Sequence, residues 1–164
     1  MKKYGLLLLI TSLFLSFAVQ AKNQLKIFPI AEAMGSQKAQ KVIDGGYQFK
    51  FSNQQHREII AHHGDYSPND MASTFLRTSD ESCQAAFVSA MGSFQSRIKR
   101  KGGNAVVNIR SIYEGKVFNS TGDYECAIGS VLVGVTFIGD IVTLAEPEPE
   151  IELESDQDTD PQAK

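Results

Sequence analysis

The sequence has no tryptophan, two cysteines and five prolines among its 164 residues. Two cysteines permit one intrachain bridge, which excludes the multi-disulfide scaffolds common among small secreted domains. Glycine follows no three-residue period and the apolar residues form no heptad repeat, so collagen-like and coiled-coil structures are excluded. With 42% apolar and 21% charged residues, the composition is that of a small globular protein. The length allows one domain or a very short pair.

Motifs for catalysis are missing as well. Neither Gly102-Gly103 nor Gly115-Lys116 belongs to a GxxxxGK[ST] phosphate-binding loop, and there is no CxxC pair for a zinc or redox site. The acidic pair Asp80-Glu81 belongs to a predicted helix cap, and no serine has an identifiable His and Asp partner. We therefore expect a protein that is not an enzyme and carries no cofactor.

The N-terminal residues 1–21 have the layout of a secretory signal. Two lysines precede an apolar run over residues 6–17, and Val-Gln-Ala at 19–21 resembles a cleavage site. We expect cleavage after Ala21 and a periplasmic mature protein; a retained N-terminal anchor is the alternative, although the apolar run is short for a membrane span. No cysteine follows this run, so we expect no lipid anchor at this end.

Residues 145–164 form a strongly acidic segment. They contain eight acidic residues and one lysine, whereas residues 22–144 contain thirteen basic and eleven acidic ones. The segment has little to bury, so we expect a disordered tail after a nearly neutral body. Such a tail most often keeps a protein soluble; docking to a basic partner or loose capture of divalent cations is the alternative.

The middle of the chain predicts an α+β fold in a single domain over residues 22–144. Short β-prone runs at 26–30, 47–51 and 59–61 predict strands, and residues 31–42 are compatible with a short helix. Residues 64–78 are rich in Gly, Pro, Asn, Asp and Ser and predict a loop. Further strands are predicted at 104–113, 127–138 and 141–144, with a polar loop at 119–122 and a turn or bulge at 139–140.

The clearest predicted element is a helix over about residues 80–101. Thr78 stands three residues before Glu81, which is the spacing of a capping box, and apolar residues recur at helical spacing from Cys83 to Ile98. The double glycine at 102–103 predicts its end. We expect this one main amphipathic helix to cover one face of a small, mostly antiparallel sheet.

The two cysteines give the strongest chemical prediction. Export would place Cys83 and Cys126 in an oxidising compartment, where two thiols that can meet form a disulfide. Cys83 lies near the start of the predicted helix and Cys126 just before the core strand, so a helix packed on that strand would bring them together. Because they form no CxxC motif, we interpret the bond as structural rather than redox-active.

A family resemblance rests on motifs that occur in a fixed order. Ser-Cys-Gln at 82–84 lies near the start of the predicted helix, Gly-Gly-Asn-Ala-Val-Val follows the helix at 102–107, and Tyr-Glu-Cys at 124–126 leads into Gly-Ser-Val-Leu at 129–132. Residues 80–144 thereby resemble the C-terminal half of small envelope proteins related to the stress sensor RcsF. They also resemble YbjQ-like domains and, more closely, short exported proteins that often carry the name excinuclease ATPase subunit. Residues 22–79 match more loosely.

The resemblance implies an RcsF-like domain that acts through contacts with envelope proteins. RcsF-like proteins have two disulfides and a lipid anchor, whereas this sequence retains the positions of one bridge, Cys83 and Cys126, and has no cysteine to acylate. YbjQ-like domains form rings through their sheets, which leaves the oligomeric state of this chain open. The excinuclease name implies a nucleotide-binding loop or zinc-binding CxxC pairs that the sequence lacks.

Four residues in one short segment are candidates for a metal site. His56, His62, His63 and Asp65 are close in sequence, and imidazole and carboxylate groups suit zinc or copper. Neighbouring histidines on a strand point to opposite faces, which favours exposed histidines without a metal instead.

A second candidate site is a basic cluster. Arg97, Lys99, Arg100 and Lys101 lie at the C-terminal end of the predicted helix, where the helix dipole favours cations. They could contact an anionic lipid or glycan. No aromatic residues accompany them as a stacking platform, so we expect no binding of nucleic acid.

Two functions follow as expectations. The first is an exported, non-enzymatic binding module of the cell envelope with an unidentified protein partner. The alternative is a metal- or small-molecule-handling periplasmic protein that uses His56, His62, His63 and Asp65 together with the segment 64–78. A deep pocket at the histidines would favour the alternative, and a shallow surface beside an exposed edge strand would favour the module.

Overall fold

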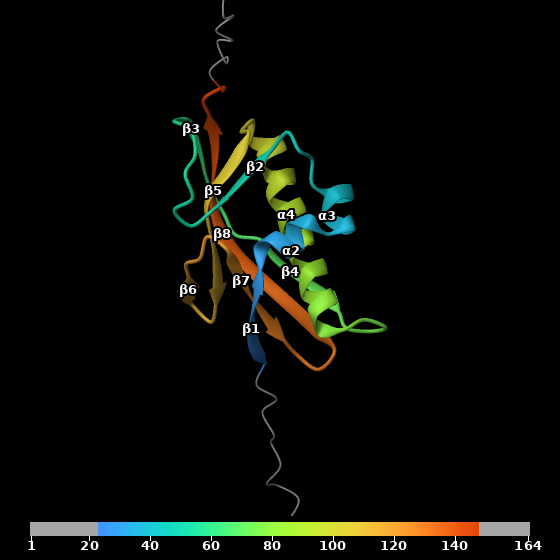
Figure 1. The fold of residues 1–164 in the computed structure, drawn as a ribbon. Helices are drawn as coiled ribbons and strands as arrows, with labels where there is room; N and C mark the ends of the chain where they lie inside the picture. Colours follow the sequence, from blue (N-terminus) through green and yellow to red (C-terminus); the bar gives the residue numbers. More distant parts are fainter. Residues whose placement is uncertain (1–22, 148–164) are drawn as a thin grey trace, which may run out of the picture.

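The computed structural model describes residues 23–147 and has an α+β fold (Figure 1). The predicted secretory signal, residues 1–21, and the acidic segment from residue 148 onward lie outside the described residues. Within residues 23–147 the elements are β1 (Gln24–Pro29), α2 (Ile30–Gly35), α3 (Gln37–Val42), β2 (Gln48–Phe51), β3 (Ile59–Tyr66), β4 (Asn69–Ser73), α4 (Ser79–Lys101), β5 (Ala105–Tyr113), β6 (Lys116–Phe118), β7 (Asp123–Ile128) and β8 (Leu132–Leu144).

The sheet is curled and mostly antiparallel. Its main path runs β1-β7-β8-β5-β2, and β3 and β4 pair in succession with the long strand β8 while β6 pairs with β5. Only the pairing of β2 with β5 is parallel among the described strands. The prediction of a small, mostly antiparallel sheet is therefore confirmed, and β1 forms one edge of it.

The long helix α4 begins and ends at the predicted signals. The Thr78 hydroxyl accepts a hydrogen bond from the Glu81 N–H at 3.2 Å, and the Glu81 carboxylate accepts one from the Thr78 N–H at 2.9 Å. The hydrogen bond from the Thr78 N–H is the main reason that the pKa of Glu81 is lowered, and the bond from the Thr78 side chain adds to it. At the other end Gly102 adopts a left-handed conformation with φ 78°, which terminates the helix without steric cost.

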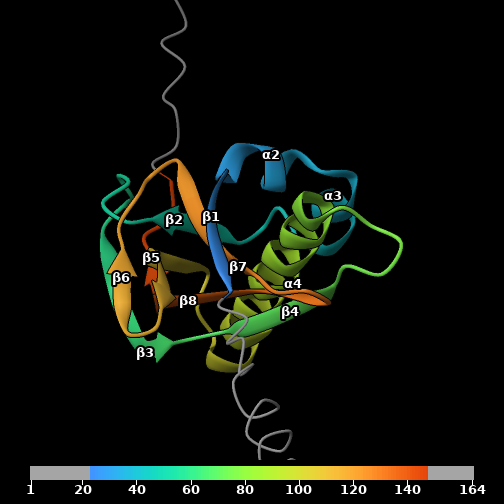
Figure 2. The ribbon, with the colours of Figure 1, turned by 90° about the horizontal axis from the view of Figure 1, so that it is seen from below.

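The three helices lie on one side of the sheet (Figures 1 and 2). α4 lies across β8 and β4, and α2 and α3 pack beside it. The core between helix and sheet has an aromatic centre. The centre of the Phe87 ring on α4 lies 4.5 Å from the centre of the Tyr124 ring on β7 and 5.7 Å from that of the Phe137 ring on β8. Because these side chains are fully buried, they supply much of the apolar area removed from water on folding.

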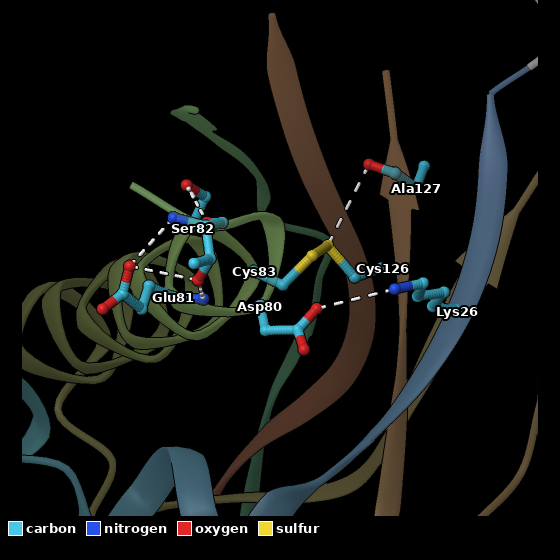
Figure 3. A network of polar contacts seen from close by, with 8 residues as sticks. Lys26, Asp80, Glu81, Ser82, Cys83, Cys126 and Ala127 are labelled. Carbon is cyan, nitrogen blue, oxygen red and sulfur yellow. Dashed lines mark hydrogen bonds and ion pairs between the residues drawn. A yellow bond between two sulfur atoms is a disulfide. The ribbon is translucent and has the colours of Figure 1, made fainter. Parts of the chain in front are cut away.

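A disulfide joins Cys83 on α4 to Cys126 on β7, as the sequence predicts (Figure 3). The two Cα atoms are 6.0 Å apart, and neither side chain is exposed to solvent. An ion pair lies beside it, with Lys26 Nζ on β1 3.6 Å from Asp80 Oδ1 on α4 (Figure 3). Both partners of that pair are largely exposed, so the covalent bond is the stronger tie between helix and sheet.

Two local predictions are wrong, and a third holds in part. The predicted loop 64–78 contains the end of β3 and all of β4, because cross-strand pairing with β8 outweighs the turn-prone composition. The predicted strand 127–138 is interrupted after Ile128 by a hairpin turn that begins at Gly129, whose N–H donates to the carbonyl of Leu132. The chain makes no turn at 139–140, since β8 continues to Leu144, but the register of its pairing with β3 and β5 shifts there, which agrees with the predicted bulge.

Gly139 allows α4 to approach β8. A Cβ at this position would lie 2.7 Å from Val106 Cγ1 and 3.3 Å from the Phe94 ring on α4. We predict that Gly139→Ala lowers the free energy of unfolding by about 1–3 kcal/mol through overpacking. Gly134→Ala on the same strand is the control, because its Cβ would meet the flexible Met71 side chain at 3.3 Å. Urea unfolding measures both variants, and equal losses would contradict this account of Gly139.

The disulfide closes a loop between residues 43 positions apart. The chain-entropy relation gives a stabilisation of about 4 kcal/mol for a loop of this length. We predict that the Cys83→Ala, Cys126→Ala double variant loses about this much stability in urea unfolding, and that adding a reductant weakens only the wild-type protein. Thiol titration of the unreduced, unfolded chain should find no free sulfhydryl, and two free thiols would refute the bond.

Candidate binding groove

One face of the sheet carries no helix. Along β8, Val133, Val135 and Phe137 point toward α4 and are buried, so the alternate residues Gly134 and Thr136 point to the opposite face. Strands β1, β7, β8 and β4 lie next to one another there, and we call their helix-free side the outer face.

A row of apolar residues crosses the outer face. Strand register places Leu25 on β1 opposite Ala127 on β7, Ala127 opposite Gly134 on β8, and Gly134 opposite Met71 on β4. The two central residues are small and the two outer ones are large, with Leu25 38% and Met71 64% exposed. The row therefore forms a groove with a low floor and raised sides.

The groove has a volume of about 730 Å³, which is within the range of ordinary ligand sites. Next to the apolar row lies a polar one, in which Glu125 on β7 is two residues from Ala127, and Thr136 on β8 pairs with Asn69 on β4. The Thr136 hydroxyl lies 3.2 Å from the side-chain oxygen of Asn69. The end of β5 contributes Tyr113 to the lining.

Glu125 is the one charged residue among those that line the groove. Its backbone N–H donates to the Ser111 hydroxyl at 3.1 Å, which attaches β7 to β5. Partial burial raises the pKa of its carboxyl group above the ordinary value for glutamate. Its side chain forms no hydrogen bond or ion pair with any residue in the range 23–147, so the carboxylate is available to a ligand.

The groove ends beside a free strand edge and an apolar tip. β1 pairs with β7 on one side and has no strand on its other side within the described chain. At the β7–β8 hairpin, Val131 is 66% exposed, and its carbonyl accepts a hydrogen bond from Thr74 N–H in the loop that carries Phe75 and Leu76. Those two side chains are also largely exposed, so the apolar surface continues beyond the groove.

The metal candidates do not come together. His63 is 2.8 Å from the Thr143 hydroxyl through Nε2, whereas the neighbouring His62 and Asp65 are exposed. His56 is 2.7 Å from the Arg57 carbonyl and lies by a separate small cavity with Asn53 and Gln54. Across residues 23–147 no three His, Cys, Asp or Glu side chains group as a metal site would require. None of the four candidates lines the 730 Å³ groove.

The basic cluster is divided between two aromatic partners. The Arg97 guanidinium lies 5.1 Å from the centre of the Tyr66 ring, and Lys99 Nζ lies 5.6 Å from the centre of the Tyr47 ring. Arg100 and Lys101 are exposed. Cation–π contacts thus direct Arg97 and Lys99 toward aromatic rings on two different segments, and the anion-binding role of Arg97, Lys99, Arg100 and Lys101 stays a prediction.

Sequence reasoning missed the groove residues, although two signals were present. Gly134 stands between two valines, and a glycine inside a strand often marks a close approach by another group. Leu25 and Ile27 alternate with Phe28 on the opposite face, so β1 is apolar on both faces at a sheet edge. Only the strand register shows that Leu25 and Met71 belong to the same row.

Comparison with known protein families and with curated proteins finds no match for the chain. Among the helices of residues 23–147, none has the length and apolarity that a membrane span requires. The groove itself is therefore the basis for a functional argument.

The raised pKa of Glu125 has a measurable effect on stability. Because folding raises this pKa, the wild-type protein is stabilised by protonation, and that contribution is lost as the pH rises through the folded-state pKa. We predict that Glu125→Gln raises the melting temperature slightly at pH 8, and that this advantage disappears as the solution is acidified. Glu58→Gln, outside the groove, is the control. An advantage that increases toward low pH would contradict the sign of the shift.

Proposed function

We propose that the protein is an exported, non-enzymatic binding module of the bacterial cell envelope, and that its groove holds an extended segment of a partner polypeptide. The observation that carries this proposal is the row Leu25–Ala127–Gly134–Met71, an apolar floor left open on a sheet whose other face carries the helices and the core. Exposed apolar surface of this kind typically marks an interaction site.

The groove suits an extended chain for two reasons. Its floor of Ala127 and Gly134 lets a backbone or side chain approach the sheet closely. Its length follows β7 and β8, so a polypeptide parallel to these strands would present every second side chain to the floor. No histidine lines the groove, so the proposed binding does not involve the histidine segment.

The location of the protein forms part of the proposal. A buried disulfide is compatible with an oxidising, exported environment. The signal-like residues 1–21 support secretion to the periplasm, and the resemblance of residues 80–144 to RcsF-like proteins supports a role in the envelope. A protein partner, rather than a lipid anchor or a nucleic acid, then accounts for the apolar groove.

Filling the groove tests the proposal directly. Gly134→Val adds bulk to the floor on a strand that favours β-branched residues, so we predict a folded protein that no longer binds. A photo-crosslinking side chain at Met71 in the full chain, expressed in bacterial cells, should give discrete protein adducts that Gly134→Val abolishes.

Ile60 provides the matched control for this experiment. It is 63% exposed, close to the 64% of Met71, but it lies on β3 outside the groove. A crosslinker at Ile60 should give none of the Met71 adducts. Identical adducts from both positions, or adducts at Met71 that persist in Gly134→Val, would show that the groove is not the binding site.

A further inference from the structure

The groove places a negative charge at a defined distance from its apolar floor. Glu125 and Ala127 are alternate residues of β7, so their side chains leave the same face of the sheet about 7 Å apart. Leu25 and Ile27 repeat this spacing on β1, since Leu25 pairs with Ala127 and Ile27 with Glu125. The outer face therefore has an apolar row and, beside it, a second row in which Glu125 stands next to the exposed Ile27; we call this second row the charged row.

Among residues 23–147, no basic side chain forms an ion pair with this carboxylate. On the neighbouring strand β1, Lys26 points to the other face and pairs with Asp80 at 3.6 Å (Figure 3). The remaining polar residues of the charged row, Thr136 and Asn69, are neutral and are 3.2 Å apart, in contact with each other. Partial burial disfavours the charged form of Glu125 and so raises its pKa. A cation close to the carboxylate would offset this cost by stabilising the charged form.

We propose that the groove selects extended segments in which a Lys or Arg stands two residues from an apolar residue. The apolar side chain lies on Ala127 and Gly134 between Leu25 and Met71, and the cation pairs with Glu125. This inference rests on the proposed function, because it specifies the sequence of the bound polypeptide. The spacing matches because both chains are extended. Residues i and i+2 of the bound segment are separated by the same distance as Ala127 and Glu125 on β7.

Two charged residues adjoin Glu125 without lining the groove. Asp123, the alternate residue of β7, accepts a hydrogen bond from the Ser120 hydroxyl at 3.3 Å. Arg110 on β5 precedes Ser111, whose hydroxyl accepts from the Glu125 N–H.

From β5, Tyr113 lines the groove, and partial desolvation together with the neighbouring Glu114 raises the pKa of its hydroxyl. Tyr113 is therefore neutral at physiological pH. Across the sheet, Lys26 and Asp80 neutralise each other. Of the two ionisable residues that line the groove, Glu125 is the one whose charge changes below neutral pH.

Blocked nine-residue peptides of alternating leucine and threonine are suitable probes. In one peptide the central leucine is replaced by lysine, in a second by glutamate and in a third by methionine. Fluorescence anisotropy with the full mature chain should show the lysine peptide binding about ten-fold tighter than the glutamate peptide, the advantage of about one charge-assisted contact. This preference should fall as the pH is lowered through the pKa of Glu125.

A charge reversal makes the test specific. Glu125→Lys should invert the preference toward the glutamate peptide, Glu125→Gln should remove it, and the control Glu58→Gln should keep it. Equal binding of all three peptides that Gly134→Val abolishes would overturn the charge selection but leave the proposed groove function intact. Absence of binding by every peptide, or binding that survives Gly134→Val, would overturn both. A preference unchanged in Glu125→Lys would also overturn the charge selection.

Discussion

The disulfide between Cys83 and Cys126 attaches α4 to one face of the sheet and leaves the other face without a helix. The helix start and β7 are held with their Cα atoms 6.0 Å apart, and the aromatic core of Phe87, Tyr124 and Phe137 forms directly beyond this bond. In a domain of this size one such bond is a large share of the net stability. The covered face therefore serves folding, and the uncovered face is free to serve binding.

The uncovered face differs from an ordinary solvated sheet in its side chains. Polar residues normally alternate with buried apolar ones on a half-exposed antiparallel sheet. Here the outward positions include Leu25, Ala127, Gly134 and Met71, with a single carboxylate, Glu125, beside them. Apolar surface costs free energy when it faces water, and a partly desolvated charge costs more, so both features support the proposal that a ligand covers this face.

Local signals in the sequence were sufficient for most of the helical and covalent structure. The capping box at Thr78, the glycine at 102 and the two cysteines each act through short-range or strongly constrained chemistry, and all were predicted correctly. The sequence could not show that residues 69–73 form an edge strand, because that outcome depends on pairing with β8, about sixty residues later. The groove was missed for the same reason, since its row joins four strands from three distant parts of the chain.

Binding in the groove can be located by an NMR titration of the isotopically labelled mature protein with the lysine peptide. We expect amide shift changes to be concentrated at Ala127, Gly134, Glu125 and Met71, and the amides of His62 and Arg100 to remain unchanged. Changes gathered at the histidine segment or at the C-terminal end of α4, with a silent outer face, would contradict binding in the groove.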